Sequence, residues 1–437
     1  MKHQPSTIMR VGAAVIGNAF EWYDFSIYAS LTAVISSVFF PVDPADPTTQ
    51  VNAVLATTTV FGVGFLMRPV GGVVLGVIGD KYGRRTGMVL GMALMAVSIL
   101  MMVCAPSYAA AGILAPLIIV LARLVQGFSL GGQFGTSTAF LIEMAPPGRT
   151  GLYGSWQMVG QVAAFAAGTA FGVLLTECYT PAELAAGMWR LPFVFGLVIL
   201  PLTWYVRHYL EESKTFIALK KERDSGKVEG LGMSLVGHTR QLLVSVGLIA
   251  ASAVSFYAIY GYTVTYAKTA LHMPVEQAFT AELVAACLML VVIPIGGLLC
   301  DRFSAHRRGM LILFLAVYFC MMYPAYSWLV ASPTVFKLLL VQLAISVVSG
   351  LFLGVYCTTM SVMLPARIRS TGLSIANNIS VLIFGGFAQF FLTWIYKATG
   401  SQIAPVYYVM GGIALGLIGA VFMPAAEEDA SSAAAAK

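Results

Sequence analysis

Residues 76–85 read GVIGDKYGRR, and residues 297–308 read GLLCDRFSAHRR. Each stretch follows an apolar run and has a glycine, an aspartate four positions later and then arginines. The two aspartates, Asp80 and Asp301, are separated by an offset of 301 − 80 = 221 in the numbering. The segments 150–152 and 371–373 both read TGL and have the same offset, 371 − 150 = 221. We interpret two repeated elements at one offset as the trace of a duplicated unit.

The composition predicts a chain that folds in lipid. Of its 437 residues, 59% are hydrophobic and 10% are charged, and the mean hydropathy is +0.84. Soluble domains carry about 25% charged residues. A bilayer crossing needs about 20 mostly apolar residues, and such runs recur along the whole chain. We predict helices over 11–39, 52–79, 87–105, 112–143, 150–176, 188–208, 240–268, 277–300, 309–330, 335–363, 370–397 and 403–424.

One long polar stretch divides these helices six and six. We therefore predict an N-terminal six-helix bundle over 1–208, a central loop over 209–239, a C-terminal six-helix bundle over 240–424 and a disordered tail over 425–437. The fold class is an all-α membrane protein with twelve transmembrane helices in two six-helix repeats. Paired halves are typical of transporters whose site lies between them near the bilayer midplane.

Positive charges predict the orientation, because Lys and Arg are concentrated in cytoplasmic loops. With both termini placed in the cytoplasm, all but six of the 25 Lys and Arg lie on the cytoplasmic side. The exceptions are Lys268, Lys337 and Lys397 outside, and Arg68, Arg123 and Arg190 within the membrane. The net charge of +6 is thus a topology signal, and we expect no nucleic-acid partner.

Ionisable residues inside the membrane are the main functional candidates, because each costs about 2.5–3.5 kcal/mol at the bilayer centre. Glu21 and Asp24 lie roughly 16–21 Å beyond Arg10 along the first helix. They form either a proton site or a permanent ion pair with Arg123 or Arg68. The charged residues inside the membrane in the first half have no charged counterparts at the repeat positions of the second half. Adding the offset to 21, 24, 68 and 123 leads to the uncharged residues Leu242, Ser245, Met289 and Ala344.

The membrane arginines are candidate ligands for a carboxylate, because a guanidinium offers a planar fork of donors. Arg68 is the main substrate-binding candidate, and Arg123 is assigned to coupling and binding. Arg190, beside Trp189, is either an interfacial anchor or a cavity residue. Weaker binding candidates are polar residues that could equally bond neighbouring helices. They are Gln157, Gln161, Tyr260 and Asn377.

A second set of charges lies at predicted cytoplasmic helix ends, where a charge network could hold one conformation closed. The proposed gating residues are Asp80, Arg84, Arg85, Glu143, Asp301, Arg307 and Arg308. Glu282, near the outer end of the eighth helix, is interpreted as an interfacial carboxylate. The sequence shows no metal-ligand spacing and no catalytic constellation, so we expect no cofactor, no metal and no enzymatic activity.

Residues 76–85, their degenerate copy and RLVQG at 123–127 together resemble the major facilitator superfamily. Four further motifs are similar to its metabolite:proton symporter branch, and most similar to the citrate–proton symporters. They are GNAFEWYDF at 17–25, GFLMRP at 64–69, SWQ at 155–157 and WRLPF at 189–193. Betaine carriers share these motifs. The resemblance implies a multi-pass protein of the bacterial inner membrane that works as a monomer.

The function expected from the resemblance and the charges is proton-coupled symport. The chain would import a small organic polycarboxylate, citrate or a related di- or tricarboxylate, by alternating access. Arg68 and Arg123 would neutralise the carboxylates, while Asp24, helped by Glu21, carries the proton. Alternatives are a symporter of a 2-oxoglutarate, phthalate or shikimate-type acid, or of a betaine or proline zwitterion. An organic-acid exporter and a receptor without transport also stay open.

Overall fold

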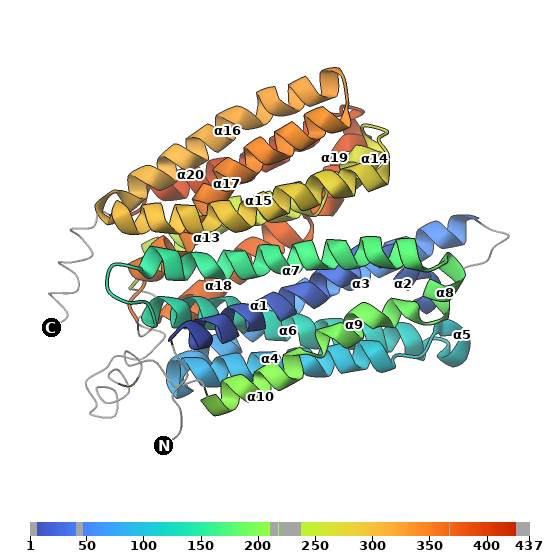
Figure 1. Cartoon of the computed structure of the whole chain (residues 1–437), viewed down its shortest axis with the longest axis horizontal. Helices are drawn as coiled ribbons and strands as arrows, with labels where there is room; N and C mark the ends of the chain where they lie inside the picture. Colours follow the sequence, from blue (N-terminus) through green and yellow to red (C-terminus); the bar gives the residue numbers. More distant parts are fainter. Residues whose placement is uncertain (1–6, 41–46, 210–216, 218–236, 367, 425–437) are drawn as a thin grey trace. The chain divides into compact units, whose positions relative to one another are not determined.

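Every regular element in the described part of the chain is a helix (Figure 1). The computed structural model describes residues 7–40, 47–209, 217, 237–366 and 368–424. The predicted central loop and C-terminal tail lie almost wholly outside these residues. Contacts divide the chain into two compact units, namely residues 1–137 with 160–212 (unit 1) and residues 138–159 with 213–437 (unit 2).

Unit 1 contains the helices formed by the first six predicted runs. The C-terminal end of α6 from residue 138 and the N-terminal part of α7 up to residue 159 belong to unit 2. Short helices join the long ones. The elements are α1 (Thr7–Ser30), α2 (Thr32–Phe39), α3 (Pro47–Tyr82), α4 (Arg84–Cys104), α5 (Tyr108–Ala111), α6 (Leu114–Glu143), α7 (Thr150–Cys178), α8 (Pro181–Ala186), η1 (Met188–Arg190), α9 (Leu191–Gly196) and α10 (Ile199–Tyr209).

Unit 2 contains the helices formed by the last six predicted runs. They are α13 (Thr239–Val254), η2 (Ser255–Tyr260), α14 (Thr263–Thr269), α15 (Val275–Arg302), η3 (Ser304–His306), α16 (Arg307–Ala331), α17 (Val335–Met363), α18 (Arg369–Val381), η4 (Leu382–Gly386), α19 (Ala388–Thr399) and α20 (Ala404–Val421). All twelve predicted runs are therefore helical, and the predicted fold class is confirmed.

Four of the twelve predicted helices are interrupted. The first breaks at Leu31 between α1 and α2, and the sixth is divided into η1, α9 and α10. In unit 2, η2 and η4 are π-helical turns inside the seventh and eleventh helices. Such turns are frequent at functional sites. A hydropathy pattern does not reveal them, because the apolar run continues through the break.

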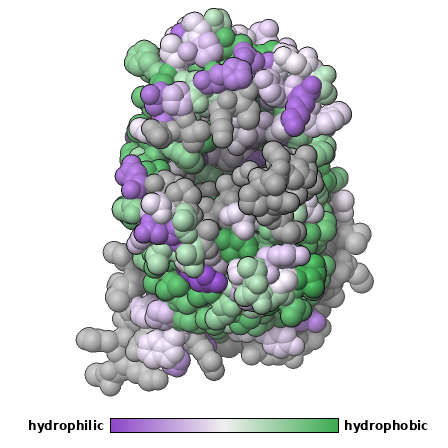
Figure 2. Space-filling model, turned by 90° about the vertical axis from the view of Figure 1, so that its right-hand side faces the viewer, coloured by the Kyte–Doolittle hydropathy of each residue, from purple (hydrophilic) through white to green (hydrophobic). Residues whose placement is uncertain are grey.

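The surface of the helices fits a lipid environment. Eleven helices of the described residues are long and apolar enough to cross a bilayer. α1 is not among them, and it carries the polar residues Asn18, Glu21 and Asp24. Large apolar side chains are exposed along the helices, such as Leu66 and Val70 on α3. On the end of the molecule in Figure 2, hydrophilic side chains are scattered among hydrophobic ones.

Glycines allow α3 and α6 to approach closely in unit 1. A Cβ on Gly127 would overlap the carbonyl oxygen of Gly64, and one on Gly131 would overlap that of Arg68. Gly127 and Gly131 form a G-x-x-x-G motif, which lets helix backbones meet in membranes. Unit 2 repeats this packing, since a Cβ on Gly354 of α17 would overlap the carbonyl of Ile293 in α15.

We predict that Gly127→Ala destabilises the protein by about 1–3 kcal/mol, because the added methyl group forces α3 and α6 apart. The measurement is thermal unfolding in detergent. Gly62→Ala, on the same α3, is the matched control, since nothing lies within 4 Å of the added Cβ. Removing a helical glycine should leave that variant unchanged or up to about 1 kcal/mol more stable. Equal melting temperatures for the two variants would contradict the close crossing.

Candidate functional site

Three buried side chains of α1 and α6 form one polar cluster in unit 1. The amide nitrogen of Gln126 donates to Oδ2 of Asp24, and Nη1 of Arg123 donates to the amide oxygen of Gln126. Nη1 of Arg123 also lies 3.7 Å from Oδ2 of Asp24. Asp24 is 1% exposed and Arg123 is 2% exposed. Gln126 thus bridges a carboxylate and a guanidinium that are both withdrawn from water.

The cluster leaves specific atoms unused. Among the described residues, Oδ1 of Asp24 and both Nε and Nη2 of Arg123 are buried without a hydrogen-bond partner. Nε and Nη2 form the side edge of the guanidinium, which is the edge that binds a carboxylate through two parallel hydrogen bonds. Buried polar groups in proteins are nearly always satisfied. The unused atoms therefore indicate where a proton and an anionic ligand can bind.

Aromatic rings cover the guanidinium groups of Arg123 and Arg68. The guanidinium carbon of Arg123 lies 3.6 Å from the ring centre of Tyr28. That of Arg68 lies 4.1 Å from the ring centre of Phe65 and 5.6 Å from that of Trp22. Arg68 is 2% exposed. Stacking on aromatic faces is a property of arginine that lysine does not reproduce. The side chain of Glu21 lies outside the described residues.

Arg190 does not join this cluster in the described contacts. Its Nε donates to the carbonyl of Val103 at 3.0 Å, and its Nη2 donates to the carbonyl of Ala105 at 2.7 Å. Its guanidinium also stacks on Trp189, with 4.4 Å to the ring centre. These carbonyls end α4, where the helix dipole favours a cation. The geometry favours the anchoring role, and substrate binding by Arg190 stays a prediction.

The weaker polar candidates are all buried. Gln157 is fully buried, and Nε2 of Gln161 has no partner among the described residues. In unit 2 the hydroxyl of Tyr260 lies 2.7 Å from that of Ser346, and Asn377 is 6% exposed. Their burial agrees with either helix packing or ligand binding, so these assignments stay predictions.

Several predicted gating residues meet within unit 2. Asp301 accepts hydrogen bonds from the backbone N–H groups of Gly151 (2.5 Å) and Leu152 (2.9 Å), at the start of α7. The first turn of a helix carries unpaired N–H groups and a positive partial charge, so a carboxylate is stabilised there. Glu143, at the end of α6, forms an ion pair of 3.3 Å with Arg369. The segment between α6 and α7 is held at both ends.

The remaining gating candidates have other partners. Arg307 donates to the hydroxyl of Thr150 at 3.4 Å and so belongs to the same cluster. Arg308 donates instead to the carbonyl of Val421 at 2.6 Å, at the end of α20. In unit 1, Asp80 near the end of α3 and Arg84 at the start of α4 form a buried ion pair with each other. Arg85 follows Arg84 and is partly exposed.

Several residues of these clusters were not among the predicted site residues. Gln126 follows Arg123 by three positions and thus lies on the same helix face, which is the sequence signal that could have revealed it. Tyr28 lies one helical turn after Asp24. Arg369 could have been recognised only through its partner Glu143.

One interpretation of the sequence was wrong. Glu282, interpreted as an interfacial carboxylate, is only 4% exposed. The helix that carries it, α15, turns this side chain inward, away from the surface. Apolar residues surround Glu282 in the sequence on all sides, and hydropathy alone does not show which face of the helix is buried.

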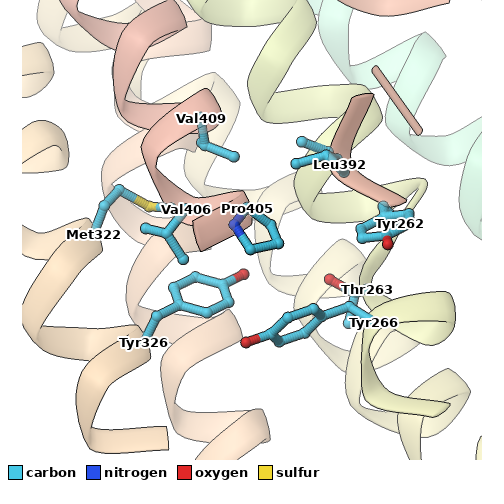
Figure 3. Close-up of a pocket in the computed structure, with 10 residues that line it drawn as sticks. Tyr262, Thr263, Tyr266, Met322, Tyr326, Leu392, Pro405, Val406 and Val409 are labelled. Atoms are coloured by element: carbon cyan, nitrogen blue, oxygen red, sulfur yellow. The ribbon is translucent and has the colours of Figure 1, made fainter. Parts of the chain in front are cut away.

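Unit 2 also encloses a small pocket lined by tyrosines (Figure 3). Tyr262, Thr263 and Tyr266 line it from the seventh predicted helix, and Tyr326 lines it from α16. The rings of Tyr266 and Tyr326 pack edge to face, with centres 5.9 Å apart. Apolar side chains of η2, α16, α19 and α20 complete the lining, so this site is aromatic and uncharged.

Comparison with known proteins identifies the class of protein. Residues 11–233 match the family described as sugar (and other) transporter. The fold matches a solved structure of the proton:xylose symporter XylE bound to 6-bromo-6-deoxy-D-glucose, with a TM-score of 0.78, 15% identity and 95% of each chain covered. The chain therefore belongs to the major facilitator superfamily of membrane transporters, as its motifs indicated.

Two groups of characterised relatives are similar over most of their length. The citrate-proton symporter of Klebsiella pneumoniae is 31% identical over 417 residues, which is 95% of this chain and 92% of the relative. The proline/betaine transporter of Escherichia coli (strain K12) is 34% identical over 421 residues, 94% and 82% of the two chains. Overall identity thus does not separate an organic-acid carrier from a zwitterion carrier.

We predict that Gln126→Met destabilises the protein, because Asp24 and Arg123 each lose a charge-assisted hydrogen bond, a type that contributes about 1.5–3 kcal/mol. Thermal unfolding measures the effect. Gln133→Met, on the same helix, is the matched control. Both amide atoms of Gln133 are buried without a partner among the described residues, so its replacement should be neutral or stabilising. Equal destabilisation by both changes would show that the bridge contributes nothing.

A second prediction concerns Arg190. Arg190→Ala should lower stability by about 1–3 kcal/mol, because two carbonyls at the end of α4 lose a charged donor. The KM for the transported solute should stay unchanged, and Arg190→Lys should recover only part of the stability, since an ammonium lacks the planar fork. A rise in KM with unaltered stability would instead place Arg190 in the substrate site.

Proposed function

We propose that the protein is a proton-coupled symporter that moves a small organic polycarboxylate, citrate or a related di- or tricarboxylate, by alternating access. The observation that carries the proposal is the unused edge of Arg123 beside Asp24. A guanidinium with two free parallel donors suits a carboxylate, and a carboxylate with one free oxygen suits a proton. The citrate-proton symporters among the relatives support this substrate class.

The geometry provides a route for coupling. Oδ2 of Asp24 lies 3.7 Å from Nη1 of Arg123, so the carboxylate partly neutralises the guanidinium. At an effective dielectric constant of about 20, a charge pair at this distance interacts by about 4 kcal/mol. A proton bound to Asp24 removes this interaction and leaves Arg123 available to an anion. Each ligand therefore favours binding of the other, as symport requires.

Arg68 would recognise a second carboxylate of the substrate. It is buried in the same unit, and its guanidinium lies near the rings of Phe65 and of Trp22 on α1. A polycarboxylate has two or more negative groups to neutralise, whereas a monoacid or zwitterion has one. We therefore assign the first carboxylate to Arg123 and the second to Arg68.

The alternative substrate is a betaine or proline zwitterion. Its single carboxylate would use the edge of Arg123 alone, and its ammonium would need aromatic faces. Proline/betaine transporters among the relatives, 34% identical to this chain, support this alternative. The requirement for Arg68 separates the two substrates.

The contacts around residues 143–152 suggest the gate of this cycle. We propose that Asp301, Arg307 and the Glu143–Arg369 pair hold one end of the helices closed, and that this end faces the cytoplasm of a bacterium with both chain termini. Opening would break the two hydrogen bonds to the start of α7. Charge networks of this kind have two arrangements, as a gate needs.

The test is uptake of labelled citrate into proteoliposomes, with and without an inward proton gradient. We expect the gradient to drive accumulation. Asp24→Asn should keep exchange of citrate but lose accumulation, because Asn binds no proton. Arg68→Ala should weaken citrate binding about 10–100-fold, the loss of one charge-assisted contact of about 1.5–3 kcal/mol.

Two controls make the outcome specific. Lys337→Ala removes a lysine that has no role in the proposal and whose described contacts are the carbonyl of Trp328 and the hydroxyl of Ser332, so it should leave uptake unchanged. Labelled betaine is tested in parallel. Betaine uptake without citrate uptake, insensitive to Arg68→Ala, would reject the polycarboxylate and leave the zwitterion carrier. No uptake of either, with the protein folded, would reject both.

A further inference from the structure

Unit 2 contains one buried carboxylate that the proposed mechanism does not use. Glu282 lies two turns into α15, about 10 Å along the helix from Val275, and is 4% exposed. Within the described part of the chain, no lysine or arginine forms an ion pair with it, and the group that interacts with it electrostatically is Tyr260. Among the described residues, Glu282 therefore has no cationic partner of the kind that Asp24 has in Arg123.

Tyr260, which interacts electrostatically with Glu282, belongs to a group of uncharged polar side chains. The hydroxyl of Tyr260 lies 2.7 Å from that of Ser346 in α17, the helix that packs most extensively on α15. One turn earlier on the same face, Gln342 donates to the hydroxyl of Thr263 at 2.6 Å. Its amide oxygen is buried and has no partner among the described residues.

The titratable groups on the elements packed against α15 do not neutralise Glu282 in the described contacts. On α17, Lys337 donates to the carbonyl of Trp328 and to the hydroxyl of Ser332. Tyr356 and Cys357 lie about three turns beyond Ser346 on the same helix. On α14, Tyr266 donates to the carbonyl of Gln402. The side chains of Lys268 and of Glu276 lie outside the described residues. On η3, His306 lies at the opposite end of α15.

We propose that Glu282 is a second proton-binding residue of the transporter, independent of Asp24. A carboxylate buried without a cation is strongly disfavoured, whereas the neutral acid can donate a hydrogen bond and be buried at far lower cost. Glu282 therefore holds a proton in this conformation. The inference rests on the proposed proton-coupled symport, to which it adds a second proton per cycle.

The element that carries Tyr260 suggests how the proton is exchanged. Tyr260 ends η2, a π-helical turn that Gly261 follows. The carbonyl of Gly261 accepts a hydrogen bond from the side-chain amide of Gln389 on α19 at 2.9 Å. A side chain, and not a backbone N–H of the same helix, therefore bonds this carbonyl at the interruption. Rewinding the turn would shift Tyr260 relative to Glu282 and expose the carboxyl group to water, to which the proton passes.

The test compares wild type with Glu282→Gln, which mimics the neutral acid, in proteoliposomes with the membrane potential clamped at zero. Loss of one transported proton should lower the accumulation ratio of the solute tenfold for each unit of pH difference across the membrane. Unchanged accumulation in a folded Glu282→Gln protein would overturn the inference. If wild type itself shows no proton-driven accumulation, the proposed function fails, and the following measurement decides on Glu282 alone.

The second measurement is the infrared C=O band of a protonated carboxylic acid, recorded without transport. The band should be present in wild type, lost in Glu282→Gln and shifted in Glu282→Asp. Lys268→Met is the control for a hidden ion pair and should leave the band unchanged. A band that is absent from wild type and appears only in Lys268→Met would show that Glu282 is ionised, and would overturn the inference.

Discussion

The structure depends on one constraint, namely that a polar group inside the membrane must find its partner within the protein. In unit 1 the constraint acts on Asp24 and Arg123. The side-chain amide of Gln126 donates one hydrogen bond to Asp24 and accepts one from Arg123. Gln126 immediately precedes Gly127, where α6 meets α3 most closely. The helix crossing that glycine permits is therefore the same feature that fixes the bridging amide. The residue that bridges the charges, Gln126, and the residue that allows the close helix packing, Gly127, are adjacent in the chain. A change in the packing of α6 on α3 is therefore expected to alter the hydrogen bonds of Gln126 as well.

The fold could be predicted from the sequence because its determinants are local and repeated. Apolar runs long enough to span lipid locate the helices, and two repeated elements at one common offset indicate the duplication. The breaks at Leu31 and at the π-helical turns η2 and η4 could not be predicted. They arise from tertiary contacts, such as the bond between Gln389 and the carbonyl of Gly261, which leave no mark in hydropathy.

The candidate site was predictable in its charges but not in their partners. Depth along a helix identifies Asp24 and Arg123 as buried, because each is surrounded by apolar sequence. Which atoms remain unused follows only from three-dimensional geometry, as the free side edge of Arg123 shows. Asp301 illustrates the same limit, since it binds backbone N–H groups at the start of α7, and backbone donors carry no sequence signal.

The two units share a scaffold and differ in chemistry. Ser245 is the counterpart of Asp24 in the repeat. Its hydroxyl donates a hydrogen bond to the carbonyl of Gln241, one turn earlier on the same helix, and thus needs no ionic partner. The G-x-x-x-G motif persists in both units, at 127–131 and at 350–354, although its register has shifted slightly from the offset of the other repeated elements. Glu282 in turn has Phe61 at its counterpart position, so each unit carries an ionisable group that the other lacks. Because neither buried carboxylate is inherited from the repeat, each needs its own functional explanation, and the proton binding that we propose would account for both.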